Sequence, residues 1–160
     1  MYHVDILLGG NMGNTLEIFG KSKVQLGKSV GSIVRESSLY RTEAWGFDSE
    51  PFLNQVITIE TNLLPQELLQ TLLSIEESFG RVREGDGYAA RTLDMDILFV
   101  ENRIINGPDL IVPHPRMAER RFVLEPLSEL YPERIHPVTG KAISQMLEEC
   151  SDTSDVEKHP

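Results

Sequence analysis

The run from Arg91 to Val100 places two carboxylates, Asp94 and Asp96, inside an otherwise apolar segment. Such a segment is typical of a β-strand, in which alternate side chains point to the same face, so the two aspartates share one face of a sheet. Like charges on one face disfavour each other's ionisation, which indicates that a cation balances them. Mg²⁺ is the natural candidate because it prefers carboxylate oxygens and is completed by substrate phosphates and water. The alternative is an ordinary solvated strand face, because two aspartates at this spacing lie more often on such a face than at a metal site.

The pattern of apolar residues, glycines and prolines predicts the elements around this strand. In chain order they are a strand at 2–8, a helix from Asn14 to Gly31, strands at 32–41 and 53–61, a helix from Pro65 to Gly80, and the aspartate strand. The order βαββαβ is that of the ferredoxin-like fold of the α+β class, an antiparallel sheet with both helices on one face. We therefore expect the other face of the sheet to be free for a ligand.

The chain of 160 residues with 40% apolar content predicts one globular domain over residues 1–160, without linkers or repeats. Residues 101–107 read as a turn into a short extra strand, and Leu127 to Tyr131 as part of a helix. The acidic segment 151–160 reads as a disordered tail.

Composition excludes several functional classes. No apolar stretch is long enough to span a bilayer, and the N-terminus lacks a basic region followed by an apolar block, so we expect neither secretion nor membrane insertion. The single Cys150 excludes an internal disulfide and a cysteine-based zinc cluster, as is common in a reducing cytoplasm. A net charge of -10 argues against a nucleic-acid partner.

Arginines nevertheless concentrate in one part of the chain. Seven of the ten lie between positions 81 and 121, an interval without lysine. Arginine presents a planar fork suited to phosphate, although several of these could simply pair with neighbouring acids.

Two long connections, 42–52 and 80–91, are expected to be functional, and the second combines arginines with glycines as a mobile lid would. An ordinary flexible loop is the alternative for 80–91.

A series of short motifs resembles, in content and order, the 6-hydroxymethyl-7,8-dihydropterin pyrophosphokinase family of folate biosynthesis. They are Gly9–Gly13, Ser38–Thr42, Phe52–Asn54, Gly80–Arg83, Arg91–Ile97, Val112–Met117 and Arg120–Phe122. The resemblance spans nearly the whole chain. It implies the ferredoxin-like fold and an ATP-dependent transferase that moves the β,γ-diphosphate of ATP to the hydroxymethyl group of the pterin, giving the diphosphate ester and AMP.

The resemblance also implies roles for individual residues. Asp94 and Asp96 would hold two Mg²⁺ ions, and the catalytic set would be Arg81, Arg83, Arg91, Asp94 and Asp96. ATP would be bound by Glu76, Arg81, Arg83, Tyr88, Arg91, Ile97, His114 and Arg120. The pterin would be bound by Thr42, Glu43, Trp45, Phe52, Asn54, Asp94 and Phe122, with the two phenylalanines sandwiching the flat ring; for these aromatics, plain core packing is the alternative.

The chain departs from the family pattern in the lid segment, where Tyr88-Ala89-Ala90-Arg91 replaces the usual Trp-Gly-Pro-Arg. Pro115 stands where some members place a tyrosine near the nucleotide, and Asp109 and Ile111 stand where some place polar or basic groups that contact ATP, so the resemblance says least about the adenine and ribose contacts. We expect a monomeric cytoplasmic enzyme. A non-catalytic ferredoxin-like binding module is the alternative, although it would need neither the two aspartates nor the arginine-bearing loop, and a phosphotransferase acting on another small molecule is a third reading.

Overall fold

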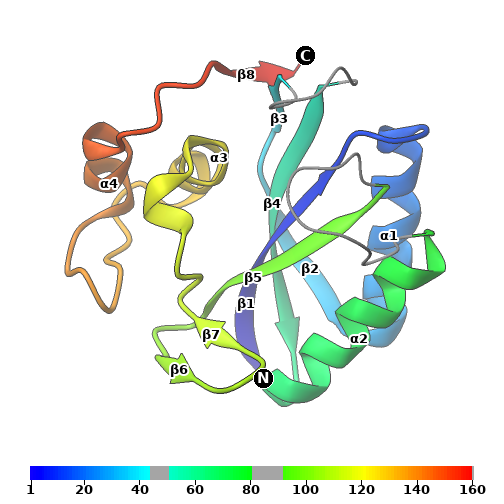
Figure 1. The fold of residues 1–160 in the computed structure, drawn as a ribbon. Coiled ribbons are helices and arrows are strands. Elements are labelled where there is room, and N and C mark those ends of the chain that lie inside the picture. Colours follow the sequence, from blue (N-terminus) through cyan, green and yellow to red (C-terminus); the bar gives the residue numbers. More distant parts are fainter. Residues whose placement is uncertain (44–50, 81–91, 160) are drawn as a thin grey trace.

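A six-stranded antiparallel sheet forms the centre of the protein, in a computed structural model that describes residues 1–43, 51–80 and 92–159. The strand order is β5-β1-β4-β3-β8, and β2 also pairs with β4 (Figure 1). The strands are β1 (Tyr2–Gly10), β2 (Gly31–Glu36), β3 (Leu39–Thr42), β4 (Phe52–Thr61), β5 (Asp94–Val100) and β8 (Val156–His159). This arrangement confirms the expected ferredoxin-like fold.

Helices α1 (Thr15–Ser29) and α2 (Pro65–Ser78) cover one face of the sheet (Figure 1). Asn14 caps α1 as predicted, because its side-chain oxygen accepts the Glu17 backbone N–H at 3.2 Å. Apolar residues at helical spacing face the sheet and form the main core with the alternate residues of β1, β4 and β5 that point to this side. Pro65 is the first residue of α2, as predicted, because the fixed φ of proline suits the first position of a helix.

The second face of the sheet is only partly free, so the expectation of an open face is corrected. Helices α3 (Arg121–Leu130) and α4 (Ile143–Glu149) pack across one half of it (Figure 1). Their apolar residues make a second core against Leu7, Val56, Leu98 and Phe99. Among the described residues, α3 and α4 leave the remaining half, toward the start of β5, uncovered.

The predicted strand 32–41 is two strands, with a break at Ser37. There the Ser37 hydroxyl accepts the Val56 N–H at 3.0 Å and so takes the place of a backbone carbonyl in the ladder. In the opposite sense, β1 does not stop before its glycines but continues to Gly10, and Gly9 pairs with Asn54 of β4. Local propensity did not predict either feature, because pairing with neighbouring strands determines where these strands break and end.

The C-terminus also differs from the prediction, because residues 156–159 are not a disordered tail but strand β8, which is antiparallel to β3. Without β8, β3 would be an edge strand with unpaired backbone groups, and those groups order the tail.

The expected extra strand after Val100 is confirmed as β6 (Ile105–Asn106), which pairs with β7 (Ile111–Val112) ahead of a short 3-10 helix, η1 (Met117–Glu119). No helix in the described ranges has the length and hydropathy needed to cross a bilayer.

Candidate active site

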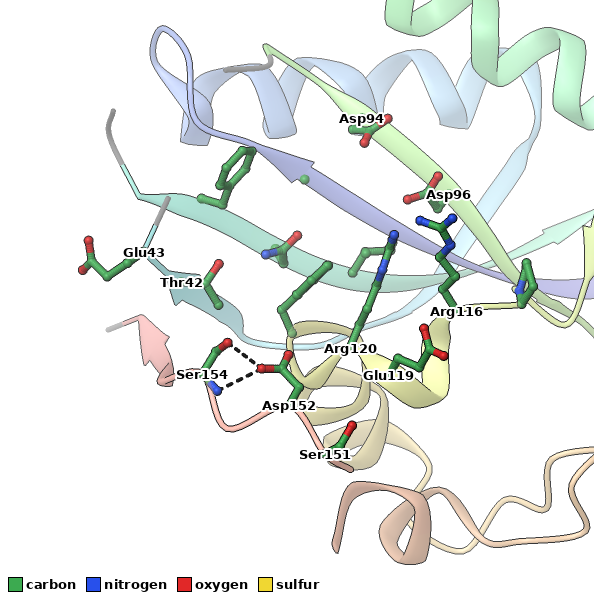
Figure 2. Close-up of a pocket in the computed structure, with 16 residues that line it drawn as sticks. Thr42, Glu43, Asp94, Asp96, Arg116, Glu119, Arg120, Ser151, Asp152 and Ser154 are labelled. Atoms are coloured by element: carbon green, nitrogen blue, oxygen red, sulfur yellow. Dashed lines mark hydrogen bonds between the residues drawn. The ribbon is translucent and has the colours of Figure 1, made fainter. Parts of the chain in front are cut away.

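A cavity of about 970 Å³ lies over the open half of the second face of the sheet. Its floor consists of residues from β1, β4 and β5, and one wall comes from η1 and the beginning of α3 (Figure 2). The end of β3 and the segment that precedes β8 complete the lining. Elements from the whole length of the chain therefore meet at one place.

The floor contains a row of three residues on neighbouring strands, with Gly9 of β1 paired to both Asp94 of β5 and Asn54 of β4. A Cβ atom at Gly9 would lie 2.9 Å from the Asn54 Oδ1 atom, closer than real Cβ atoms approach. Glycine is therefore needed for the side-chain amide of Asn54, a residue that is only 5% exposed, to lie where it does. Phe52, two residues before Asn54, lines the same floor.

Asp94 and Asp96 both line the cavity, while Met95 and Ile97 between and after them pack into the main core on the other face. The alternation predicted from the sequence is thus confirmed. Two half-buried carboxylates on one face provide oxygen donors for Mg²⁺, which commonly takes only one or two carboxylates and completes its shell with water and phosphate. Within residues 1–43, 51–80 and 92–159, no group of three or more acidic, histidine or cysteine side chains could hold a metal ion. Two carboxylates on one face are a donor set that fits Mg²⁺.

The facing wall is basic. Arg116 and Arg120 line the cavity and extend toward the strand that bears the two aspartates (Figure 2). The Arg120 guanidinium carbon lies 5.7 Å from the centre of the Phe122 ring, which lines the same wall. A basic wall opposite an acidic floor can bind an anion and its counter-cation together.

Three residues expected to contact ATP have side chains outside the cavity lining. The Glu76 side chain is almost fully buried and accepts the Met95 backbone N–H at 2.7 Å. Ile97 packs in the main core, since it lies on the strand face opposite the aspartates.

His114 is the third of these residues. Its Nδ1 atom accepts the Arg116 backbone N–H at 3.2 Å. Burial, reinforced by the charges of Arg120 and Arg116, lowers the pKa of His114 to about 4. The imidazole is therefore neutral near pH 7, and it holds the backbone of a cavity arginine.

Eight of the residues predicted from the sequence line the cavity together: Thr42, Glu43, Phe52, Asn54, Asp94, Asp96, Arg120 and Phe122. The predictions for Trp45, Arg81, Arg83, Tyr88 and Arg91, and the lid proposed for 80–91, lie outside the described residues.

Sequence reasoning missed several lining residues, among them Arg116, Glu119, Asp152 and Ser154. Arg116 could have been found, because it belongs to the arginine cluster and to a motif already singled out. The two residues near the C-terminus carry no comparable signal, since only the fold brings them to the cavity.

Comparison with known proteins matches residues 5–132 to the family described as 7,8-dihydro-6-hydroxymethylpterin-pyrophosphokinase. The chain is 40% identical over 148 residues to the 2-amino-4-hydroxy-6-hydroxymethyldihydropteridine pyrophosphokinase of Synechocystis, covering 92% of this chain and 75% of that protein. It is 45% identical over 129 residues to the folate synthesis bifunctional protein of Arabidopsis thaliana, covering 79% of this chain but only 26% of that protein.

Among solved structures, wild-type Plasmodium falciparum HPPK-DHPS superposes with a TM-score of 0.73 at 16% identity. The superposition covers 92% of this chain and 44% of the solved chain. The chain thus spans less than half of that protein, and at this identity the likeness concerns the fold alone.

Proposed function

The chain belongs to the 7,8-dihydro-6-hydroxymethylpterin-pyrophosphokinase family, the transferases of folate biosynthesis that use ATP as co-substrate, and we propose that the cavity described above is where the transfer occurs. In this reaction the pterin hydroxymethyl oxygen forms a bond to the β-phosphorus of ATP. The bond from that phosphorus to the oxygen on the α-phosphorus breaks, AMP leaves, and the hydroxyl proton is released. The observation that carries the proposal is the acidic pair Asp94 and Asp96 facing Arg116 and Arg120 across one cavity.

The pterin is proposed to lie over the floor near Asn54. A buried amide with both a donor and an acceptor matches the amide-like edge of the pterin ring and would be costly to leave unpaired. Phe52 on the floor and Phe122 on the wall supply two aromatic faces for a flat ring between them. Thr42 and Glu43 border the same end of the cavity.

The triphosphate is proposed to lie between the acidic pair and the basic wall. Asp94 and Asp96 would hold two Mg²⁺ ions, which when bound neutralise charge on the transferring group. Arg120 and Arg116 extend toward the same space (Figure 2). A guanidinium group can donate two parallel hydrogen bonds to a phosphate, so both side chains suit this role. The protein's part is to keep the attacking oxygen and the leaving group in line, which lowers the entropic part of the barrier.

Further ATP contacts are proposed from the family motifs for Arg81, Arg83, Tyr88 and Arg91. Any direct contact by Ile97 would come from its backbone, because its side chain is in the core. Glu76 and His114 are proposed to support the site through the backbone N–H groups that they accept.

We further propose one domain over residues 1–160 that acts as a cytoplasmic monomer. The return of β8 to the central sheet supports a single domain. A non-catalytic binding module is not favoured, because such a module has no need of two carboxylates opposite two arginines.

The test is mass spectrometry of 6-hydroxymethyl-7,8-dihydropterin incubated with the protein, ATP and Mg²⁺. We expect the pterin to gain the mass of two phosphate units while AMP forms in equal amount, and the Asp94→Asn variant to form neither product. A gain of one phosphate unit with ADP, or the absence of any change with the wild-type protein, would contradict the proposal.

A further inference from the structure

The segment 151–159 forms a third side of the cavity. Ser151, Asp152 and Ser154 line it, and residues 156–159 form β8. This segment lies beyond residues 5–132, which match the family. We propose that residues 151–159 are a strap that fixes the wall carrying Arg120 and Phe122, and that Asp152 is its positioning residue. The inference rests on the proposed function for the roles of those two wall residues.

The strap caps the helix that begins the wall. The Oδ2 atom of Asp152 accepts the backbone N–H of Arg121, the first residue of α3, at 3.0 Å. The N-cap residue of α3, Arg120, provides no side-chain cap of its own. The first N–H groups of a helix need acceptors, and a negative charge there also interacts favourably with the helix dipole. Asp152 therefore supplies, from 31 residues further along the chain, the cap that the local sequence lacks.

The position of this cap matters because Arg121 lies between the two cavity residues. Arg120 precedes it and Phe122 follows it, and both line the wall. A hydrogen bond to the backbone at 121 thus holds the two flanking residues at a set distance from the floor.

The Asp152 carboxylate is itself held in place. Its Oδ1 atom accepts both the backbone N–H of Ser154, at 2.9 Å, and the Ser154 hydroxyl. Burial raises the pKa of Asp152, but the hydrogen bonds from Ser154 and Arg121 outweigh it and lower that pKa below its ordinary value. The group is therefore ionised near pH 7, with each oxygen engaged by a different part of the chain.

The far end of the strap is fastened to the sheet. Val156 pairs with Thr42, another cavity residue, and Lys158 Nζ lies 3.7 Å from Glu129 of α3. Glu129 in turn accepts the Tyr40 hydroxyl of β3 at 2.6 Å. The strap, α3 and β3 therefore form one connected unit, in which the Asp152 carboxylate joins the strap to the beginning of α3.

The test compares Asp152→Ala with Asp155→Ala, a matched control on the same segment whose exposed side chain does not line the cavity. Pterin affinity is measured by calorimetry with Mg²⁺ and an unreactive ATP analogue, and amide exchange is followed at residues 121 and 122. We expect Asp152→Ala to weaken pterin binding about five- to tenfold, the size expected from loss of a helix cap, and to speed exchange at both amides. Asp155→Ala should change neither quantity.

Asp152→Asn keeps an oxygen that can accept the Arg121 N–H, so it should restore most of the affinity lost in Asp152→Ala. This variant also keeps the test valid if the alanine variant folds poorly. Wild-type affinity and slow exchange in Asp152→Ala, equal losses in Asp155→Ala, or an asparagine variant as weak as alanine would each overturn the strap. A wild-type protein that forms no diphosphate ester would instead refute the proposed function, while amide exchange at Arg121 would still report the cap.

Discussion

The floor and the wall of the cavity are held in position by different means. The floor lies on paired strands. Gly9 of β1 pairs with β4 on one side and with β5 on the other, and this register fixes the positions of Asn54 and Asp94 beside it. The wall depends on side chains that bond to distant backbone, such as Asp152 to Arg121 and Glu129 to Ser38. A ladder distributes position over many bonds along a strand, whereas the wall is tied to distant segments through a few side chains. Floor substitutions should therefore affect chemistry and recognition directly, and wall substitutions should act by smaller, graded displacements.

The largest effect should come from Asp96→Ala on the floor. Removing a proposed Mg²⁺ ligand should lower kcat on the order of a thousand-fold, since metal stabilisation of transition-state charge is worth several kcal/mol. Stability should be kept or rise, because like-charge repulsion with Asp94 is removed. Turnover is read by AMP release and folding by a thermal melt; a variant that turns over normally would remove Asp96 from the metal site, and one that does not fold would make it structural.

Asn54→Ala should come next. Leaving the pterin edge without its partner costs roughly 1–3 kcal/mol, which corresponds to about a five- to 150-fold weaker pterin Kd. ATP binding should hardly change, because the amide lies at the pterin end of the floor. Separate calorimetric titrations with each ligand decide the matter, and equal losses for both ligands would contradict the assignment.

Gly9→Ala should imitate Asn54→Ala through geometry alone. The new methyl group would meet the Asn54 Oδ1 atom at 2.9 Å and displace the amide, so pterin affinity should fall by up to the same factor. The double variant Gly9→Ala/Asn54→Ala should then bind pterin no more weakly than Asn54→Ala, since residues that act through one another are not additive. Additive losses would show that Gly9 acts by another route.

Glu129→Gln, on the wall side, should lower the free energy of unfolding rather than the rate of the reaction. Burial raises the pKa of Glu129, but the bonds from Tyr40 and Ser38 and the charge of Lys158 lower it overall. A carboxyl with a lowered folded pKa stabilises the protein above its unfolded pKa, and this stability is lost as pH falls through the folded pKa. The variant should therefore be about 1–2 kcal/mol less stable at pH 7, with the difference shrinking below about pH 4.5. A difference independent of pH in denaturant titrations would contradict this account.

Near pH 7 the smallest effect should come from His114, which changes stability only as the pH falls. Because its pKa in the folded protein is about 4, the unfolded chain binds a proton that the folded one does not as pH falls from about 6.5. Stability should thus decline between about pH 6.5 and 4, and His114→Gln should show a flatter profile over that window. An NMR titration that places the His114 midpoint near 6.5 would refute the burial argument.

The same contrast explains what the sequence could predict. Period-two alternation placed Asp94 and Asp96 on one face, and helix signals at Asn14 and Pro65 set the helices, because these features depend on residues close in sequence. The role of Gly9 was missed, since a glycine pair reads as a break until its partner Asn54 is known.

The wall was less predictable because its determinants are far apart. Nothing in residues 151–159 indicates a strand by itself, and β8 forms only because β3 offers backbone partners. His114 was assigned to ATP binding from its motif, and that assignment stays a prediction; what the fold adds is that its Nδ1 atom accepts the Arg116 backbone N–H. Motifs identify which residues matter, whereas the fold decides whether they act by contact or by support.

The pairing of β8 with β3 also bears on self-association. β8 is four residues long and contains Glu157 and Lys158, features that discourage another chain from adding to a sheet edge. If β8 were lost, the backbone donors and acceptors of β3 that it occupies would be exposed beside the cavity. A second copy of the chain could then add its own strand there, so shortening the C-terminus should promote intermolecular sheet formation at the same edge that borders Thr42.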